Sequence, residues 1–327
     1  MSNLIVSSYD IVEPQLSEYL KKGAEPGLYL GYECLDPHYT HKASGVTDWT
    51  GFPGSGKTYM ALQMQMNLSV KYAQRHGLFV PDIGSDKEIY AKLIKMYTGK
   101  DFNDKYSNKI TEAEMKEAMN WVMHHFVVLK KKDYKKGVEP VEFWEFVAEF
   151  KDDSGKLDTG LIDSWKNLKH IYSGREDSYL DETLSIRNEI AETHNIHFHT
   201  IAHAVKTEIE KDGQGKRRIP TAWDIKGGGS WYANGKNIIT VDFPNKSAYN
   251  VDLYVSKTKP EDVGKVGNII GKLKLDPKRG QYYETYNFNP CFAFEARKKK
   301  IDEPELEFGA PMPISTEQND NKGELPF

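Results

Sequence analysis

The residues with the most specific chemistry in this 327-residue sequence are Gly51-Phe52-Pro53-Gly54-Ser55-Gly56-Lys57-Thr58. They have the spacing of a phosphate-binding loop, with glycine at both required positions and Lys-Thr at the end. Glycines let the backbone wind around a triphosphate so that N–H groups point at the anion. Lys57 would contact the β- and γ-phosphates and the Thr58 hydroxyl would hold Mg²⁺, which predicts ATP and Mg²⁺ as cofactors. The predicted phosphate cradle consists of Gly51, Pro53, Gly54, Ser55, Gly56, Lys57 and Thr58.

Two elements must position this loop. Residues 46–50 read as a short strand, and residues 59–68 read as a helix because they are rich in strong helix formers and lack Pro and Gly. A strand, a Gly-rich turn and a helix N-terminus place the phosphate at the positive end of the helix dipole. The alternative, an ordinary Gly/Ser loop between two elements, fits this context less well.

The composition is that of a soluble globular protein, with 39% hydrophobic and 28% charged residues. No apolar run approaches membrane-spanning length and no signal peptide is recognisable, so we expect no membrane partner. Cys34 and Cys291 do not make a disulfide framework, which favours a reducing cytoplasm. The net charge of −4 means that nucleic acid would have to bind a local basic surface.

Short apolar strands alternate with amphipathic helices, which indicates an α/β fold with a mostly parallel sheet flanked by helices. We expect strands at 77–80, 126–129, 160–162, 196–202, 237–241 and 250–255. We expect helices at 86–97, 111–124, 140–150 and 179–194. The chain divides into a polar lead-in over 1–26 with a short helix at 15–22, a core over 27–290, and an acidic tail of disordered composition over 291–327.

An acidic residue follows one of these strands at the edge where α/β sheets present their ligands. Asp163, directly after Leu161-Ile162, is the predicted second Mg²⁺ ligand beside Thr58. The alternative is an Asp that caps the helix after it. The sequence leaves both open, although the position at a strand end favours the metal role.

Asp82 ends another predicted strand, directly after Pro81. A carboxylate there can accept a proton from the attacking water and align that water with the γ-phosphate. Asp is shorter than Glu, so the neighbouring acids Asp86 and Glu88 are alternative candidates. Ordinary helix-start chemistry is the competing explanation for Asp82.

A third predicted strand ends at His203, a polar group that can sense the γ-phosphate. An ordinary structural histidine is the alternative. His197 and His199 precede it and share a strand face, which raises the question of zinc. Because no Cys or acid completes a tetrahedral set within this run, the sequence disfavours a zinc site.

Cations gather in the segments that follow. The polar stretch 205–220 lacks apolar periodicity, which predicts a loop whose cations can follow nucleic-acid phosphates, with a solvated charge run as the alternative. The turn 224–230 would offer N–H groups and one cation to a backbone phosphate. The predicted DNA-binding residues are Lys216, Arg217, Arg218, Lys226, Gly227, Gly228 and Gly229. Lys257 and Lys259, on one face of a strand end, can complete an active site in their own or a neighbouring subunit, or are ordinary surface lysines.

Together these segments resemble, in family order, the motifs of superfamily 4 ring helicases of the DnaB-like and Twinkle-like type. The resemblance covers roughly residues 27–285. The matching segments are 35–36 with 44–51, 79–82 with 86–88, 97–100 with 110–112 and 125–126, 162–168, 200–203, 220–231, and 255–259 with 263–265.

This resemblance implies a RecA-like ATPase core in a homo-hexamer, with Mg·ATP between subunits and single-stranded DNA in the central channel. It implies a phage-type replicative DNA helicase or translocase. The implied catalytic residues are Lys57, Asp82, Asp163, His203, Lys257 and Lys259. Asp82 stands where the family usually has Glu. Lys259 stands where the family usually has Arg, so a compact ammonium replaces a planar guanidinium group.

Other functions stay open at this stage. One is a non-unwinding RecA-like DNA-binding ATPase that acts in recombination or loading, and another is a DNA-independent phosphoryl transferase. A third is a degenerate ring subunit that serves as a scaffold. The last residues, 320–327, resemble the acidic Pro-Phe tip of bacterial single-strand-binding proteins, a docking peptide for replication and repair proteins. A replication partner would then bind Leu325-Pro326-Phe327, unless so short a match arises by chance.

Overall fold

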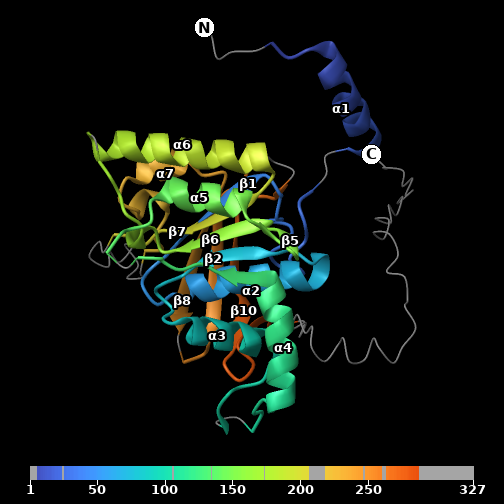
Figure 1. Ribbon diagram of the computed structural model, residues 1–327, viewed down its shortest axis with the longest axis vertical. Helices are drawn as coiled ribbons and strands as arrows, with labels where there is room; N and C mark the ends of the chain where they lie inside the picture. The colour runs from blue at the N-terminus through green and yellow to red at the C-terminus, as the bar shows by residue number, and fades with distance from the viewer. Residues whose placement is uncertain are drawn as a thin grey trace, which may run out of the picture.

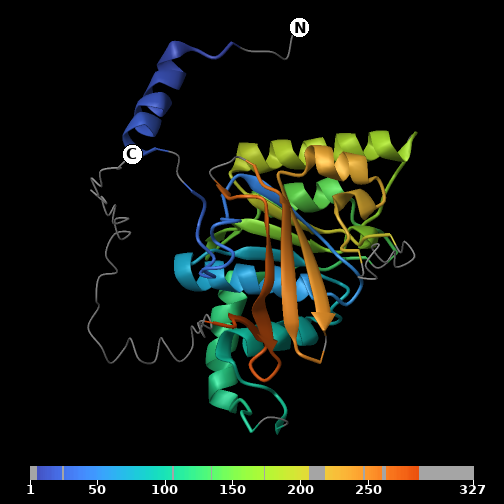
Figure 2. The same cartoon turned by 180° about the vertical axis from the view of Figure 1, so that it is seen from behind.

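The computed structural model describes residues 6–23, 26–104, 107–133, 135–172, 174–205, 218–245, 247–259 and 263–286. Within them, helices cover both faces of a central sheet (Figure 1). One face carries α5 (Pro140–Glu149), α6 (Glu176–His194) and α7 (Gly228–Asn234). The other carries α2 (Lys57–Tyr72), α3 (Asp86–Thr98) and α4 (Glu112–His125), as Figures 1 and 2 both show.

The sheet has nine strands in the order β11-β10-β9-β8-β1-β7-β6-β2-β3. The six strands from β8 to β3 run parallel, and β9, β10 and β11 extend the sheet in antiparallel fashion. The strands are β1 Gly45–Thr50, β2 His76–Phe79, β3 Phe126–Val128, β6 Thr159–Asp163, β7 His197–Ile201, β8 Asn237–Asn245, β9 Asn250–Lys257, β10 Gly267–Asp276 and β11 Gln281–Glu284. A small hairpin, β4 (Lys151–Asp152) with β5 (Gly155–Lys156), lies outside this sheet. Because β1, β2, β6 and β7 are parallel, the residues after them meet at one edge.

The predicted α/β fold is confirmed, and each expected strand and helix is present within a few residues of its expected bounds. Three differences matter. The lead-in helix α1 spans Tyr9–Lys22 and so contains Pro14, where the sequence predicted a helix only after this proline. The strands β10 and β11 were not expected, and α7 replaces part of the expected turn at 224–230.

A buried ion pair fixes the centre of the sheet against α6. The Arg187 guanidinium donates from Nη1 to Asp48 Oδ1 at 2.5 Å and from Nη2 to Asp48 Oδ2 at 3.2 Å, and both side chains are fully buried. Arg187 also donates to Thr200 Oγ1 on β7 at 3.1 Å. Such a bidentate pair specifies geometry because either charge alone would be buried without compensation. Helix α6 is thereby held against β1 and β7, the strands that lead into the site.

Helix α1 stands apart from the layered body in both views (Figures 1 and 2). None of its residues is buried, and its apolar side chains are exposed, among them Leu16 at 61% and Leu20 at 87%. Within the described part of the chain, no helix is long and apolar enough to cross a membrane.

Candidate nucleotide-binding and hydrolysis site

The phosphate loop joins the end of β1 to the start of α2, as the motif predicted. Gly51, Gly54 and Gly56 have φ angles of 137°, 75° and 88°, a region that favours glycine. At Gly51, a Cβ atom would lie only 2.3 Å from the carbonyl oxygen of Val241 on β8. Glycine is therefore required at this position by the packing of β8 as well as by the backbone conformation.

Lys57 is folded back onto its own loop. Its ammonium donates to the carbonyl oxygens of Gly51 at 3.0 Å and Phe52 at 2.8 Å, and the residue is 4% exposed. Burial lowers the pKa of Lys57 to about 8, while the nearby Asp163 carboxylate opposes this shift. A bound phosphate would replace the carbonyl oxygens as the partner of this ammonium and would favour its charged form.

Thr58 and Asp163 form the pair that the sequence predicted for Mg²⁺. Thr58 Oγ1 donates to Asp163 Oδ2 at 2.6 Å, which joins the start of α2 to the end of β6. Asp163 is 2% exposed, and burial raises its pKa. A hydroxyl and a carboxylate oxygen are the hard ligands that Mg²⁺ prefers, and a cation would compensate this buried carboxylate. The residues present therefore fit the metal.

Asp82 and His203 lie at the same sheet edge as Asp163. One ligand-type atom from each of the three residues lies within 4.8 Å of the others. Asp82 Oδ2 accepts a hydrogen bond from Ser164 Oγ at 3.1 Å and lies 3.6 Å from Lys166 Nζ. The fold therefore brings together three residues that the sequence placed after three separate strands.

His203 is half-buried, and its Nδ1 atom has no hydrogen-bond partner within the described chain. Burial lowers the pKa of His203 to about 4, and the charges of Lys57 and Lys166 act in the same direction. The ring is therefore neutral at physiological pH. A neutral imidazole beside the phosphate loop offers one donor and one acceptor, which suits a polar sensor.

The other two histidines of β7 do not join His203. His197 and His199 pack with His41, with ring centroids 4.2 to 5.4 Å apart. His199 Nδ1 accepts from Trp49 Nε1 at 3.3 Å, so the proton of the neutral His199 ring is on Nε2, which cannot then bind a metal. Both ring nitrogens of His197 already have partners. These hydrogen bonds disfavour zinc at this buried cluster.

Lys257 and Lys259 lie away from the phosphate loop of their own chain. The register pairs Lys257 with Ile238 at the start of β8, whereas the phosphate loop follows the last residue of β1. The Lys257 ammonium donates to the carbonyl oxygen of Tyr232 in α7 and lies 4.9 Å from the centroid of its ring. Lys259 is exposed. A role for these lysines at the nucleotide of a neighbouring subunit stays a prediction.

The candidate DNA-binding residues divide into three groups. Lys216 and Arg217 lie outside the described residues. Arg218 pairs with Asp224, and Lys226 pairs with Glu176 at 2.7 Å while its side chain stays 73% exposed. Gly228 and Gly229 begin helix α7, where the sequence predicted an open turn, and the DNA-binding role of the glycines stays a prediction.

Gly228 has a packing role that the sequence did not reveal. It is buried, and a Cβ atom there would lie 2.5 Å from the Trp223 carbonyl oxygen. Only glycine lets the segment before α7 approach this closely. Gly227 is the N-cap of α7 with a left-handed φ of 73°. Packing and backbone conformation thus account for the first two glycines without a phosphate ligand.

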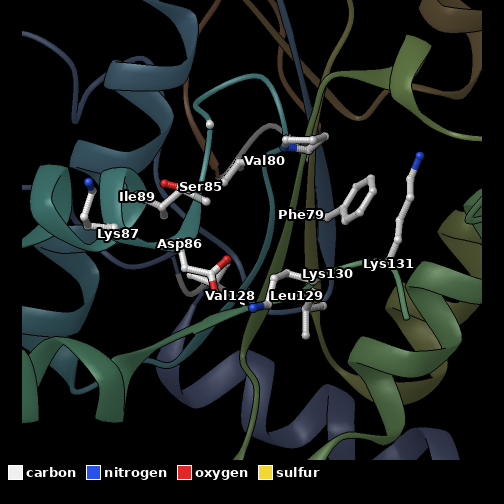
Figure 3. Close-up of a pocket in the computed structure, with 12 residues that line it drawn as sticks. Phe79, Val80, Ser85, Asp86, Lys87, Ile89, Val128, Leu129, Lys130 and Lys131 are labelled. Carbon is white, nitrogen blue, oxygen red and sulfur yellow. Dashed lines mark hydrogen bonds and ion pairs between the residues drawn. The ribbon is translucent and has the colours of Figure 1, made fainter. Parts of the chain in front are cut away.

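A cavity of about 600 Å³ lies beside the loop that carries Asp82 (Figure 3). Its apolar wall includes Phe79 and Val128, from the ends of β2 and β3. Asp86 pairs with Lys130 across it. Asp82 itself does not line this cavity. The cavity therefore adjoins the candidate catalytic loop without being the phosphate site.

Sequence reasoning missed Ser164 and Lys166 as partners of Asp82. Both follow Asp163 within the segment that resembles the magnesium-site motif, where the sequence shows their position but no role for them. Their contacts depend on the parallel pairing of β2 with β6, which brings Asp82 beside the end of β6. The signal available in the sequence was only their closeness to Asp163.

The strand order and the phosphate loop between β1 and α2 define a RecA-like fold. The chain is similar to the ATPase domain of a phage helicase, with a TM-score of 0.68 and 16% identity over 85% of this chain and 99% of that one. It is also similar to a DnaB-like replicative helicase solved to show its interactions with primase, with a TM-score of 0.64 and 15% identity over 85% and 67%. At these identities the likeness shows the fold. No protein-family model and no curated protein matches the sequence.

Proposed function

We propose that this chain is a cytoplasmic ATPase that moves along single-stranded DNA as a ring-shaped homo-oligomer, a hexamer by its family resemblance. The observation that carries the proposal is the Thr58–Asp163 pair at 2.6 Å with Asp82 and His203 at the same sheet edge. A phosphate loop alone would serve nucleotide binding. A second acid and a polar sensor beside it serve cleavage of the γ-phosphate.

Each residue of this site has a separate role in the hydrolysis of ATP. Lys57 and the loop N–H groups hold the phosphates, and Thr58 with Asp163 holds the metal. Mg²⁺, when bound, neutralises charge on the β- and γ-phosphates. Asp82 orients the attacking water and accepts its proton, and Ser164 fixes the orientation of this carboxylate by its 3.1 Å hydrogen bond. His203 contacts the γ-phosphate as a neutral ring.

The site is completed by a neighbouring copy of the chain. Lys257 and Lys259 contact the γ-phosphate across the boundary, a role favoured by the register that pairs Lys257 with Ile238 at the start of β8. Helix α1 supplies a means of assembly, because it has no buried residue and exposes Leu16 and Leu20. Burying each leucine against a second copy is worth about 1.5–3 kcal/mol. The exposed cations Arg218 and Lys226 contact the DNA backbone, together with Lys216 and Arg217, which lie outside the described residues.

The decisive experiment is ATP turnover with and without single-stranded DNA, measured together with particle mass. The wild type should assemble and should hydrolyse ATP faster when DNA is added. Lys57→Ala should abolish turnover, and Asp82→Asn should abolish it while ATP binding persists. Lys116→Ala is the matched control, since that lysine is exposed on α4 and pairs with Glu112. Wild-type turnover by Lys57→Ala would show that the site is wrongly assigned.

A non-unwinding DNA-binding ATPase is the second candidate. It is favoured by Lys257, whose ammonium donates to carbonyl oxygens of its own α7, and by Lys259, a point charge where the resemblance leads one to expect a planar arginine. A forked-duplex strand-displacement assay separates the two functions. Displacement coupled to ATP turnover supports the helicase, and DNA-stimulated turnover without displacement supports the second candidate.

Two features of the sequence stay predictions. The C-terminal tip Leu325-Pro326-Phe327 is outside the described residues, and its replication partner stays a prediction. The division into 1–26, 27–290 and 291–327 also stays a prediction. A pull-down with the immobilised C-terminal peptide and a version lacking Phe327 tests the first.

A further inference from the structure

One tryptophan is placed unlike the others. All six tryptophans lie within the described residues, and Trp223 is 62% exposed while Trp49, Trp144 and Trp231 are fully buried. Trp121 and Trp165 are partly buried. Trp223 lies in the short 3₁₀ helix Ala222–Asp224, directly before α7. An exposed indole needs an explanation, because it is among the largest apolar side chains.

The backbone around Trp223 is firmly held. Ala222 and Asp224 on either side of it are buried. Asp224 Oδ2 accepts from the Thr221 backbone N–H at 2.7 Å and from its hydroxyl at 3.0 Å. The Trp223 carbonyl oxygen and Cα fit against Gly228, where a Cβ atom would approach them within 2.6 Å. The exposed ring is therefore presented by a well-anchored segment.

The ring itself is supported on one side. Trp223 stacks on Tyr232 of α7 with a centroid distance of 5.1 Å and an interplanar angle of 25°. Tyr232 in turn lies 4.9 Å from the Lys257 ammonium. Gly229, next to the indole, offers no side chain to cover it. A stack of two aromatic rings thus ends at an indole with most of its surface open to solvent.

Two cations lie close to Trp223 in the chain. Lys226 follows it by three residues, pairs with Glu176 and exposes 73% of its side chain, and Arg218 precedes it, pairs with Asp224 and exposes 45%. Cations beside an open aromatic ring match a ligand with both a phosphate charge and a flat π-face. Unpaired nucleotides have both features. An apolar protein surface would offer these cations no phosphate or carboxylate.

We propose that Trp223, backed by Tyr232, is a stacking platform for an unpaired base of single-stranded DNA. The inference rests on the proposed function and adds a contact to the base where the candidate cations contact only the backbone. Stacking on an aromatic ring is tolerant of sequence because every base has a π-face. This tolerance suits a motor that must pass over any sequence.

The test compares a short oligothymidylate with an abasic strand that has the same number of phosphates. The wild type should bind the base-bearing strand more tightly. Trp223→Ala should weaken that binding by about 5- to 150-fold, the usual worth of one stacked base, and should leave the abasic strand unaffected. Trp223→Phe should keep much of the preference. Phe146→Ala is the control, because Phe146 is 52% exposed on α5.

A second measurement reports on the indole directly. Base-bearing DNA should quench the tryptophan emission of the wild type, and Trp223→Phe should remove most of this quenching while binding persists. Lys226→Ala should weaken both strands and reduce the salt slope by about one. If Trp223→Ala binds oligothymidylate like the wild type, or changes the oligomeric mass, the stacking proposal is wrong. If the wild type binds neither strand, the proposed function itself fails.

Discussion

Acid should destabilise this protein through four histidines that are buried as neutral rings. His41, His76, His197 and His199 are each no more than 1% exposed. Burial lowers the pKa of His76 to about 3 and that of His197 to about 4. Burial also lowers the pKa values of His41 and His199 well below the usual value. None of the four has a carboxylate partner among the described contacts that would stabilise its charged form.

The sign and size follow from proton linkage. In the unfolded chain a histidine titrates near pH 6.5, so the unfolded state takes up protons first and stability falls as pH drops below that value. At about pH 5, His76 and His197 each cost about 2 kcal/mol, together about 4 kcal/mol. His41 and His199 add to this. Burial raises the pKa of Asp36 to about 6, so the folded state takes up a proton there before the unfolded state does. This protonation stabilises the folded state by about 1.4 kcal/mol at that pH. The net loss is a large fraction of the stability of a typical domain, which is about 5–15 kcal/mol.

The assay is the free energy of unfolding by urea between about pH 7.5 and pH 5, where histidines titrate. The variant His76→Gln isolates one ring, because the two partners of His76 are the hydroxyls of Thr159 and Ser69, at 2.7 and 2.9 Å, which an amide can also bond. His124→Gln is the control, since His124 is exposed on α4. The loss of stability over this pH range should be about 2 kcal/mol smaller in His76→Gln than in the wild type.

The wild type and His76→Gln are compared by how much the free energy of unfolding of each changes with pH. This comparison removes the cost of the substitution itself, because that cost is present at both ends of the pH range. Other buried carboxylates with raised pKa values, such as Asp48 and Asp163, also cancel between wild type and variant. Parallel pH profiles for the wild type and His76→Gln would refute the reasoning. They would mean that His76 is not kept neutral by its burial.

Three further outcomes are expected. Thr58→Ala should raise the Mg²⁺ concentration needed for half-maximal turnover by at least about 10-fold, because one metal ligand is lost; an unchanged Mg²⁺ titration would argue against this ligand. Arg187→Met should cost about 3–5 kcal/mol in urea unfolding, since it leaves Asp48 buried without its partner. Adding Asp48→Asn should restore part of that loss, and a further loss would contradict the account of the pair. Mg·ATP without DNA should change the emission of Trp223, and His203→Ala should remove that change if His203 is the sensor.

The sequence predicts those parts of the site whose signals are local. The phosphate loop is one continuous motif, and Asp163 and Asp82 are recognisable because each follows an apolar strand. A parallel sheet then brings such strand ends together without further information. The roles of Ser164 and Lys166 needed the register of β2 against β6, which no short stretch of sequence encodes.

The elements that sequence reasoning missed have weak local signals. In β10, Ile269 and Leu273 are buried, but Gly271 with a φ of 69° interrupts the strand and lysines occupy its open face. In α7, consecutive glycines indicate a turn, since glycine disfavours helix. Packing against α6 and against the segment of Trp223 overrides this preference, because Gly228 is the residue that permits the approach.

The route from the nucleotide site to the candidate DNA surface is short and made of backbone. Strand β7 ends two residues before His203, and the next residue, Ala204, pairs with Ile225 in an antiparallel bridge. The Val205 N–H then donates to the Asp224 carbonyl oxygen at 2.6 Å. We expect a displacement of His203 by a γ-phosphate to be passed to Asp224 and Ile225, which lie between Trp223 and Lys226. Coupling needs such a contiguous element, shared by both sites and rigid enough to transmit a shift. The close fit of Gly228 against Trp223, where a Cβ atom would lie 2.5 Å from the Trp223 carbonyl oxygen, would supply that rigidity.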